Sequence, residues 1–234
     1  MRISETEGEA LVMAKEKQFE IEWSDETFSF RKERIADRKI VGTQIAEIAN
    51  AYPIEDFAIL RHLKTGELES IRPSELVDLE DSGIERFFIV KGATNNRFTV
   101  EGRAMEWPQA LLAAKYIKFL ALAQEDQILV LDTDTGDVEF DNDDLVDLAP
   151  PTVERFKLRK QKKTVTVYYK ETAFELERRN WSTEELLAAF SVPSGYKLDQ
   201  ISGDGEFNEL KPGEQIKLRE GMEFSSHPPV GQSS

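Results

Sequence analysis

The chain has 234 residues, with 45 acids against 30 bases and a net charge of −15. This acidity argues against binding to a nucleic-acid backbone, which needs a basic surface, and no apolar run approaches the roughly 20 residues of a membrane span. Cysteine is absent and histidine occurs only at His62 and His227, so disulfides, thiolate metal sites and thioester chemistry are excluded.

Residues 1–17 are polar and charged, and we expect a flexible segment there. They carry acids where a secretory signal would carry a basic and then an apolar region, so we expect a cytoplasmic protein. Residues 18–30 then alternate apolar and polar positions around a turn at 24–26, which predicts a β-hairpin. The apolar positions of this hairpin are Phe19, Ile21, Trp23, Phe28 and Phe30.

One helix and further strands complete the first unit. Apolar residues between Ile40 and Ala49 have helical spacing, and Pro53 ends the predicted helix. Strands are predicted at 57–63, 68–71 and 85–90.

The same order of elements recurs twice. The second pass has a hairpin at 98–107, helical spacing at 111–123, and strands at 128–131 and 154–158. The third pass has a hairpin at 165–176, a helix that begins at the capping box of Ser182 and Glu185, and a strand at 196–201.

Two segments of these units are nearly identical in sequence. Residues 75–87 read ELVDLEDSGIERF, and residues 144–156, 69 positions later, read DLVDLAPPTVERF. A diverged third copy lies at 216–224. A repeat of this length indicates tandem modules, which we place at 18–91, 97–159 and 164–226. We expect compact modules joined like beads by short linkers.

A hairpin, one helix packed across it and further strands of a mixed sheet is the element order of the β-grasp fold, which is α+β. The tandem units, the L-V-D-L and E-R-F segments and the C-terminal tail resemble the bacterial multi-ubiquitin family. This resemblance covers residues 18–231 and implies three tandem ubiquitin-like β-grasp domains, each a mixed sheet with one packed helix. It also suggests a bacterial cytoplasm, with antiviral defence as the setting.

In that family the ubiquitin-like protein is encoded beside relatives of an activating enzyme, a conjugating enzyme and a metal-dependent deconjugating peptidase. The resemblance therefore implies these three enzymes, together with conjugation targets, as partners. ATP would be used by the activating enzyme, while the chain itself would bind no cofactor and no metal.

Residues 227–234 are predicted to form an extended C-terminal tail. Pro228 and Pro229 fix φ and favour an extended conformation. We expect these two prolines and Val230 to be recognised when the tail enters a partner enzyme.

Gly231 is the candidate attachment residue. It has no Cβ, so its backbone could enter a channel too narrow for other residues. The resemblance implies that a propeptide beginning at Gln232 is removed, which would expose the Gly231 carboxylate for attachment to a target amine or hydroxyl. Ubiquitin ends in two glycines, whereas Val230 precedes Gly231 here, so the cleavage position stays open.

The internal boundaries lack comparable processing signals. The second unit ends in Phe156–Lys160 without a glycine, and Gly92 after the first unit is expected to form a turn. A precursor that is cut into monomers would carry a glycine after each unit. We therefore expect the three units to stay together.

Other signals do not indicate an active site. The segment Asp132–Asp137 resembles a calcium loop, but its glycine is fifth and Asp143 is twelfth, where an EF-hand needs glycine sixth and glutamate twelfth. His227 has no nucleophile or orienting acid at a telling spacing, so we expect no enzyme. Leu198 alternates with Lys197 and Asp199, which predicts a charged outer side for this strand.

Two functional hypotheses remain. In the first, the chain is a protein modifier that is processed after Gly231 and conjugated through that residue. In the alternative, it is a non-covalent adaptor whose modules bind partners by their sheet faces, and Gly231 has no role.

Overall fold

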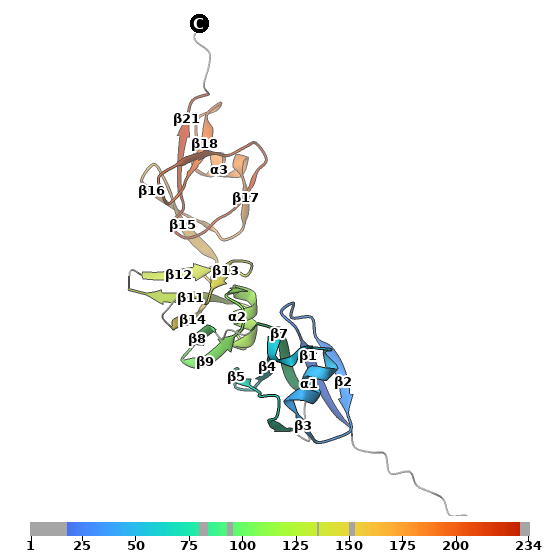
Figure 1. Cartoon of the computed structure of the whole chain (residues 1–234). Coiled ribbons are helices and arrows are strands. Elements are labelled where there is room, and N and C mark those ends of the chain that lie inside the picture. Colours follow the sequence, from blue (N-terminus) through green and yellow to red (C-terminus); the bar gives the residue numbers. More distant parts are fainter. Residues whose placement is uncertain (1–17, 80–83, 93–95, 135, 150–152, 230–234) are drawn as a thin grey trace, which may run out of the picture. The chain divides into compact units, whose positions relative to one another are not determined.

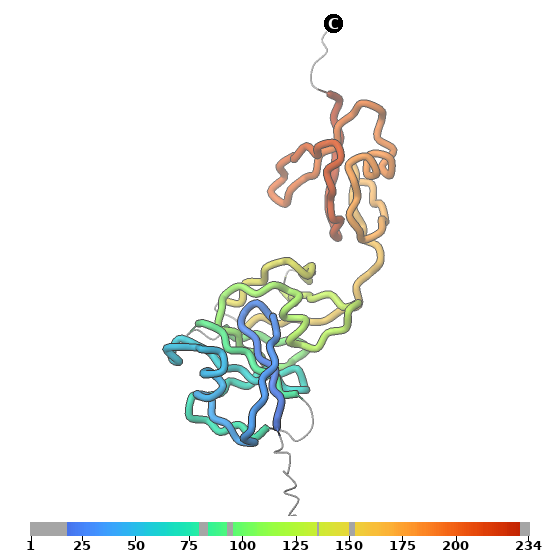
Figure 2. The backbone as a smooth tube through the Cα atoms, turned by 90° about the vertical axis from the view of Figure 1, so that its right-hand side faces the viewer, coloured from blue at the N-terminus to red at the C-terminus, as the bar shows by residue number. Residues whose placement is uncertain are grey.

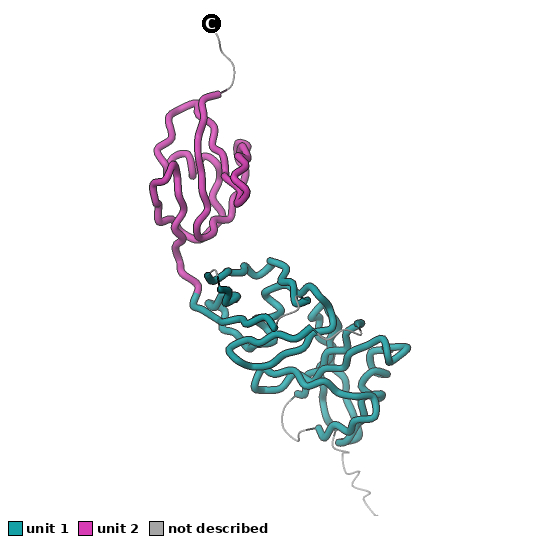
Figure 3. Tube along the Cα trace, turned by 60° about the vertical axis from the view of Figure 1, so that its left-hand side comes forward, with its two compact units in different colours: residues 1–160 teal, residues 161–234 magenta. Residues whose placement is uncertain are grey.

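The structure is a computed structural model that describes residues 18–79, 84–92, 96–134, 136–149 and 153–229 (Figure 1). The expectations for residues 1–17, Val230, Gly231 and Gln232 lie outside these ranges. The chain divides into two compact units, residues 1–160 and 161–234 (Figure 3). The first unit holds two modules and the second holds one.

The first module is a five-stranded mixed sheet with one helix across it. The strand order is β2-β1-β7-β4-β5, in which β1 and β7 are parallel and Trp23 lies opposite Phe87. The helix buries Ile45 against the inner face of the sheet, beside Ile21 and Phe87. The elements are β1 (Phe19–Ser24), β2 (Arg31–Ile35), β3 (Lys39–Val41), α1 (Gly42–Ile48), a 3-10 turn (Ile54–Asp56), β4 (Phe57–His62), β5 (Leu68–Ser70), β6 (Leu76–Asp78) and β7 (Glu85–Lys91).

The second module repeats this topology. Its sheet has the order β12-β11-β14-β8-β9, with β8 parallel to β14. The helix buries Ile117 and Leu120 in a core that also contains Phe98 and Phe156. The elements are β8 (Asn96–Val100), β9 (Arg103–Trp107), β10 (Leu111–Ala113), α2 (Ala114–Leu120), β11 (Gln127–Thr133), β12 (Gly136–Phe140), β13 (Leu145–Asp147) and β14 (Glu154–Lys160).

The third module has the same topology, with the order β16-β15-β21-β18-β19 and β15 parallel to β21. Its core contains Val167, Leu186, Leu198 and Phe224. The elements are β15 (Thr164–Tyr169), β16 (Thr172–Glu177), β17 (Asn180–Ser182), α3 (Thr183–Ala189), β18 (Lys197–Ile201), β19 (Phe207–Glu209), β20 (Gln215–Lys217) and β21 (Glu223–His227). Three tandem ubiquitin-like β-grasp domains in an α+β fold are therefore confirmed.

The repeated L-V-D segment forms a small second sheet in the first two modules. β6 pairs with β3, and β13 pairs with β10, in each case antiparallel. The central valines of the segment, Val77 and Val146, are buried, whereas the leucines before them are exposed. The repeat is thus partly explained by packing of the valine.

Three predicted boundaries are wrong. The first helix begins at Gly42, because Ile40 and Val41 lie in β3 and pair with β6. The returning strand of the first hairpin begins at Arg31, so Phe28 and Phe30 lie in the connection before it. Phe28 has a φ of 57°, which is left-handed and incompatible with a strand. The second helix begins at Ala114, because Leu111–Ala113 pairs with β13 before the helix starts.

The capping box at the start of α3 is confirmed. The Ser182 hydroxyl accepts a hydrogen bond from the Glu185 amide at 3.2 Å, and a Glu185 carboxylate oxygen accepts from the Ser182 amide at 2.8 Å. These two bonds satisfy amide groups that have no partner within the helix. They also fix the point at which β17 becomes α3.

Replacing Ser182 by alanine should lower the free energy of unfolding of the third module by about 1 kcal/mol, because one capping bond is lost. Chemical denaturation of the full chain, followed by amide exchange in residues 161–229, measures the change. Ser194→Ala, at an exposed turn position, is the matched control and should change stability by less than about 0.5 kcal/mol. Equal effects of the two variants would contradict the role of the cap.

Candidate functional site: sheet faces and the root of the tail

The outer sheet face of the first module is apolar and covered. Each sheet has an inner face that packs on its own helix, and successive strand residues alternate between this face and the outer one. Leu60, Phe88 and Val90 point outward and belong to the core cluster of the second module. All three are at most 1% exposed. The second module therefore buries the face by which the first could meet a partner.

The connection between β1 and β2 completes this junction (Figure 2). The Phe28 ring stacks on Tyr116 with a centroid distance of 4.0 Å and also contacts Trp107 at 5.4 Å and Phe88 at 4.8 Å. Aromatic pairs at these separations are worth about 0.5–1.5 kcal/mol each beyond their buried area. The left-handed backbone at Phe28 is held in place by this cluster.

Two polar contacts join the two modules, and a third, within the second module, orients the Arg103 side chain. His62 Nε2 lies 2.7 Å from the carbonyl oxygen of Leu120, close to the end of α2. The Arg103 guanidinium donates to the carbonyl oxygens of Thr65 and Ala121 at 2.9 and 3.2 Å. The first two modules thus form one packed block, and the expectation of beads is wrong for them.

Gly92 lies at this junction and has a structural role. Its φ is +150°, and a Cβ would come within 3.0 Å of the Pro108 carbonyl oxygen. Its amide donates to the carbonyl oxygen of Asp56 at 2.9 Å. The turn predicted for this glycine is not found, because its amide continues the pairing of β4 and β7, and the close approach to Pro108 disfavours a side chain here.

The residues that make the junction are not repeated in the other modules. On the sheet, Phe88 follows the buried Phe87, whereas Lys157 and Ser225 follow the corresponding Phe156 and Phe224. On the helix, Tyr116 and Phe119 correspond by position to Gln44 and Glu47 in α1 and to Glu185 and Ala188 in α3. Among the described residues, the aromatic pairing of this junction therefore occurs once.

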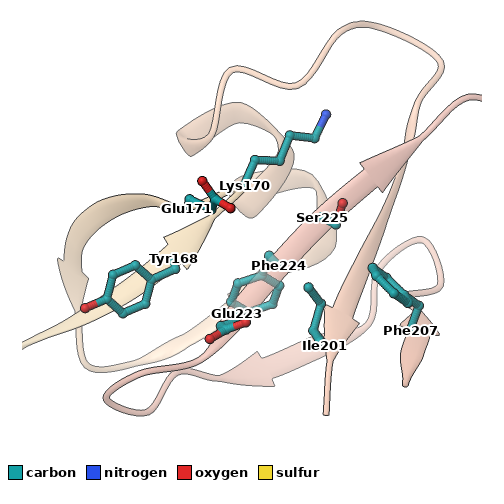
Figure 4. A pocket seen from close by; sticks show the side chains of 8 residues that line it. All are labelled: Tyr168, Lys170, Glu171, Ile201, Phe207, Glu223, Phe224 and Ser225. Carbon is teal, nitrogen blue, oxygen red and sulfur yellow. The ribbon is translucent and has the colours of Figure 1, made fainter. Parts of the chain in front are cut away.

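The outer face of the third module holds a shallow hollow (Figure 4). Its volume is about 480 Å³, and it lies on strands β15, β18, β19 and β21. Tyr168, Ile201 and Phe207 provide apolar surface, and Tyr168 and Phe207 are 39% and 63% exposed. Lys170 and Glu171 lie at its rim. The alternation along β18 predicts a charged face here. It does not reveal this surface, because Phe207 lies on β19 rather than β18.

An ionic network lies on the same face, at the end of the last strand. His227 Nδ1 is 2.7 Å from Asp199 Oδ2, and its Nε2 is 3.6 Å from Glu209 Oε2. Lys197 Nζ donates to the other Glu209 oxygen at 2.6 Å. This hydrogen bond, with the nearby charges of Lys197 and His227, holds the pKa of Glu209 below its usual value.

The predicted tail residues are only partly described. Pro228 and Pro229 follow β21 directly and are exposed. Val230, Gly231 and Gln232 lie outside the described ranges. His227 has an acidic neighbour, Asp199, although no acid stands at a telling spacing in the sequence. Spacing could not reveal this pair, because the residues are 28 positions apart and meet through strand pairing.

No metal-binding group of three or more His, Asp or Glu side chains occurs within the described ranges. In the same ranges, no helix has the length and apolar character needed to cross a membrane.

Residues 27–92, most of the first module, match the family model described as Multiubiquitin. The chain is a ubiquitin-like protein. The match supports the resemblance to a multi-ubiquitin family, and the topology of the second and third modules extends the same fold along the chain. Among curated proteins, none matches the chain.

Truncating Phe28 to alanine should destabilise both modules of the block. We expect a loss of about 3 kcal/mol, the lower end of the range for Phe→Ala, because Phe28 is only partly buried. Amide exchange of the full chain should rise in α2 as well as in β1. Phe207→Ala, which removes an exposed ring from the third module, is the control. Faster exchange confined to residues 18–92 would rule out a shared core.

Protonation of His62 should weaken the same junction. Burial lowers its pKa, the hydrogen bond to Leu120 opposes this shift, and the Arg86 charge adds to it. The folded-state pKa of His62 therefore lies below the ordinary value of 6.5. The contribution of neutral His62 to the unfolding free energy of the block is fully present above pH 6.5 and is lost as the pH falls below it.

His62→Gln tests this pH dependence, because the glutamine amide can still donate to Leu120 but does not titrate. The unfolding free energy of the wild-type block should fall more steeply between pH 7.5 and pH 5 than that of the variant. Parallel curves for the two proteins would show that His62 does not contribute.

Proposed function

We propose that this chain is a ubiquitin-like protein modifier precursor. It is processed after Gly231 and joined to target amines or hydroxyls through the Gly231 carboxylate. Its chemistry is supplied by an ATP-using activating enzyme, a conjugating enzyme and a metallopeptidase of a bacterial, cytoplasmic pathway, with antiviral defence as its setting. The chain itself is not an enzyme.

The observation that carries this proposal is the exit of the chain from the third module. β21 lies between β15 and β18 in the middle of the sheet, and it continues directly into the exposed Pro228 and Pro229. In the first two modules the corresponding strands, β7 and β14, lead into a following module. Among the three modules, the third is the one whose last strand continues into exposed prolines.

The first two modules are suited to be carried as one piece. Gly92 lies against Pro108 in the packed block and is only partly exposed. β14 continues to Lys160 without a glycine. These features support a precursor that is processed only at its end.

A non-covalent adaptor is the second candidate, and one observation favours it. The first module already binds another β-grasp module through its outer sheet face. The hollow on the third module offers apolar surface on the equivalent face. In this function the tail would have no role.

The intact mass of the full chain, co-expressed with the metallopeptidase, separates these functions. A modifier precursor should lose Gln232, Ser233 and Ser234, and Gly231→Glu should prevent this loss because a side chain blocks the narrow channel. Gly213→Ala, at a turn glycine of the same module, controls for misfolding. A wild-type chain that never shortens, while remaining folded, would contradict the modifier function and leave the adaptor.

A further inference from the structure

The third module differs from the others at the root of the tail, which we define as Ser226 and His227 at the end of β21. The third residue after the buried phenylalanine of the last strand is Val90 in the first module, Arg159 in the second and His227 in the third. Each of these residues pairs with a residue of the neighbouring strand. Two positions after that partner, the three modules carry Leu60, Val130 and Asp199, respectively. An imidazole and a carboxylate therefore meet only in the module that bears the tail.

The geometry of this pair is well defined. Asp199 lies on the outer face with its side chain only 8% exposed, and the His227 side chain is 33% exposed. Nδ1 can donate to Asp199 in the neutral tautomer with hydrogen at that nitrogen and also in the imidazolium form. Strand pairing places Lys197 opposite His227 and Glu209 opposite Asp199. The four side chains thus connect β18, β19 and β21.

His227 is also the last residue of β21 and directly precedes Pro228. Proline cannot donate a backbone hydrogen bond, so the ladder cannot continue past this point. Strand ends fray when only backbone bonds hold them. The side-chain bond to Asp199 adds a second attachment at the residue where the tail begins.

We propose that Asp199 and His227 are positioning residues that hold the root of the tail in one direction. This inference rests on the proposed function, because it assigns the pair a role in delivering the tail to a processing enzyme. A fixed root reduces the conformational freedom that the tail loses when it enters a narrow channel. Neither side chain takes part in bond breaking.

A purely structural role must be separated from positioning. Partly exposed ion pairs contribute little to stability, so a small change in unfolding would not decide the question. The variant His227→Asn separates the two roles, because its amide nitrogen occupies nearly the place of Nδ1 and can still donate to Asp199. His227→Ala cannot. Arg97→Ala, which breaks the cross-strand pair with Glu106 in the second module, is the matched control.

The full chain and these three variants are compared in two measurements. The first is the rate at which the metallopeptidase removes residues 232–234. We expect His227→Ala to lower kcat/KM by about two- to tenfold, the effect of releasing one ordered side chain and its backbone. His227→Asn and Arg97→Ala should stay within about twofold of wild type. An unchanged rate for His227→Ala, or an equal loss for His227→Asn, would overturn the proposal.

The second measurement is the ¹⁵N heteronuclear NOE of Ser226 and His227, which does not depend on any enzyme. The NOE should fall in His227→Ala and be kept in His227→Asn, and equal values in the two variants would overturn the proposal. If wild type is never shortened, the proposed processing fails, and this measurement alone then decides whether the pair holds the tail root.

Discussion

Each module depends on the parallel pairing of its first strand with its last. β1 meets β7, β8 meets β14 and β15 meets β21, so the two ends of every module lie together in the middle of a sheet. Closing a segment of this length costs chain entropy, which the apolar inner faces offset. The chain therefore leaves each module from the central strand of its sheet. This exit direction decides whether the next residue enters another module or a tail.

The outer sheet faces of the three modules differ in their side chains. In the first module this face is apolar, and the aromatic side chains of the second module cover it. In the second module Lys157 forms an ion pair with Asp132 on the corresponding face, and the resulting charge favours solvent. In the third module a half-apolar hollow lies beside an ionic network. The outer face of the third module thus keeps exposed apolar side chains beside charged ones.

Most of the fold was predictable from the sequence because it depends on local patterns and on repetition. The period of 69 residues, the alternation at Phe98 and Val100, and the capping box at Ser182 each indicate an element without knowledge of its neighbours. Phe28 was predicted wrongly for the opposite reason. Its alternation with Phe30 is typical of a strand, but both rings pack on a different module, and no local signal reports such a contact.

Of the candidate site, the sequence could indicate only the tail residues, and their role stays a prediction. Pro228 and Gly231 have conformational properties that can be read from residue type alone. The pairing of His227 with Asp199 depends on the register of β18 against β21, and a slip of one residue would turn one of the two side chains to the opposite face. The burial of Asp199 is likewise a property of three strands together. Neither follows from spacing along the chain.

The junction between the first two modules also limits how the gene could change in length. A duplicated first module placed at the front would expose the face of Leu60 and Phe88 unless its neighbour carried the rings of Tyr116 and Phe119. Exposed apolar patches of this kind favour aggregation. Each of the two modules would therefore expose part of this apolar cluster without the other.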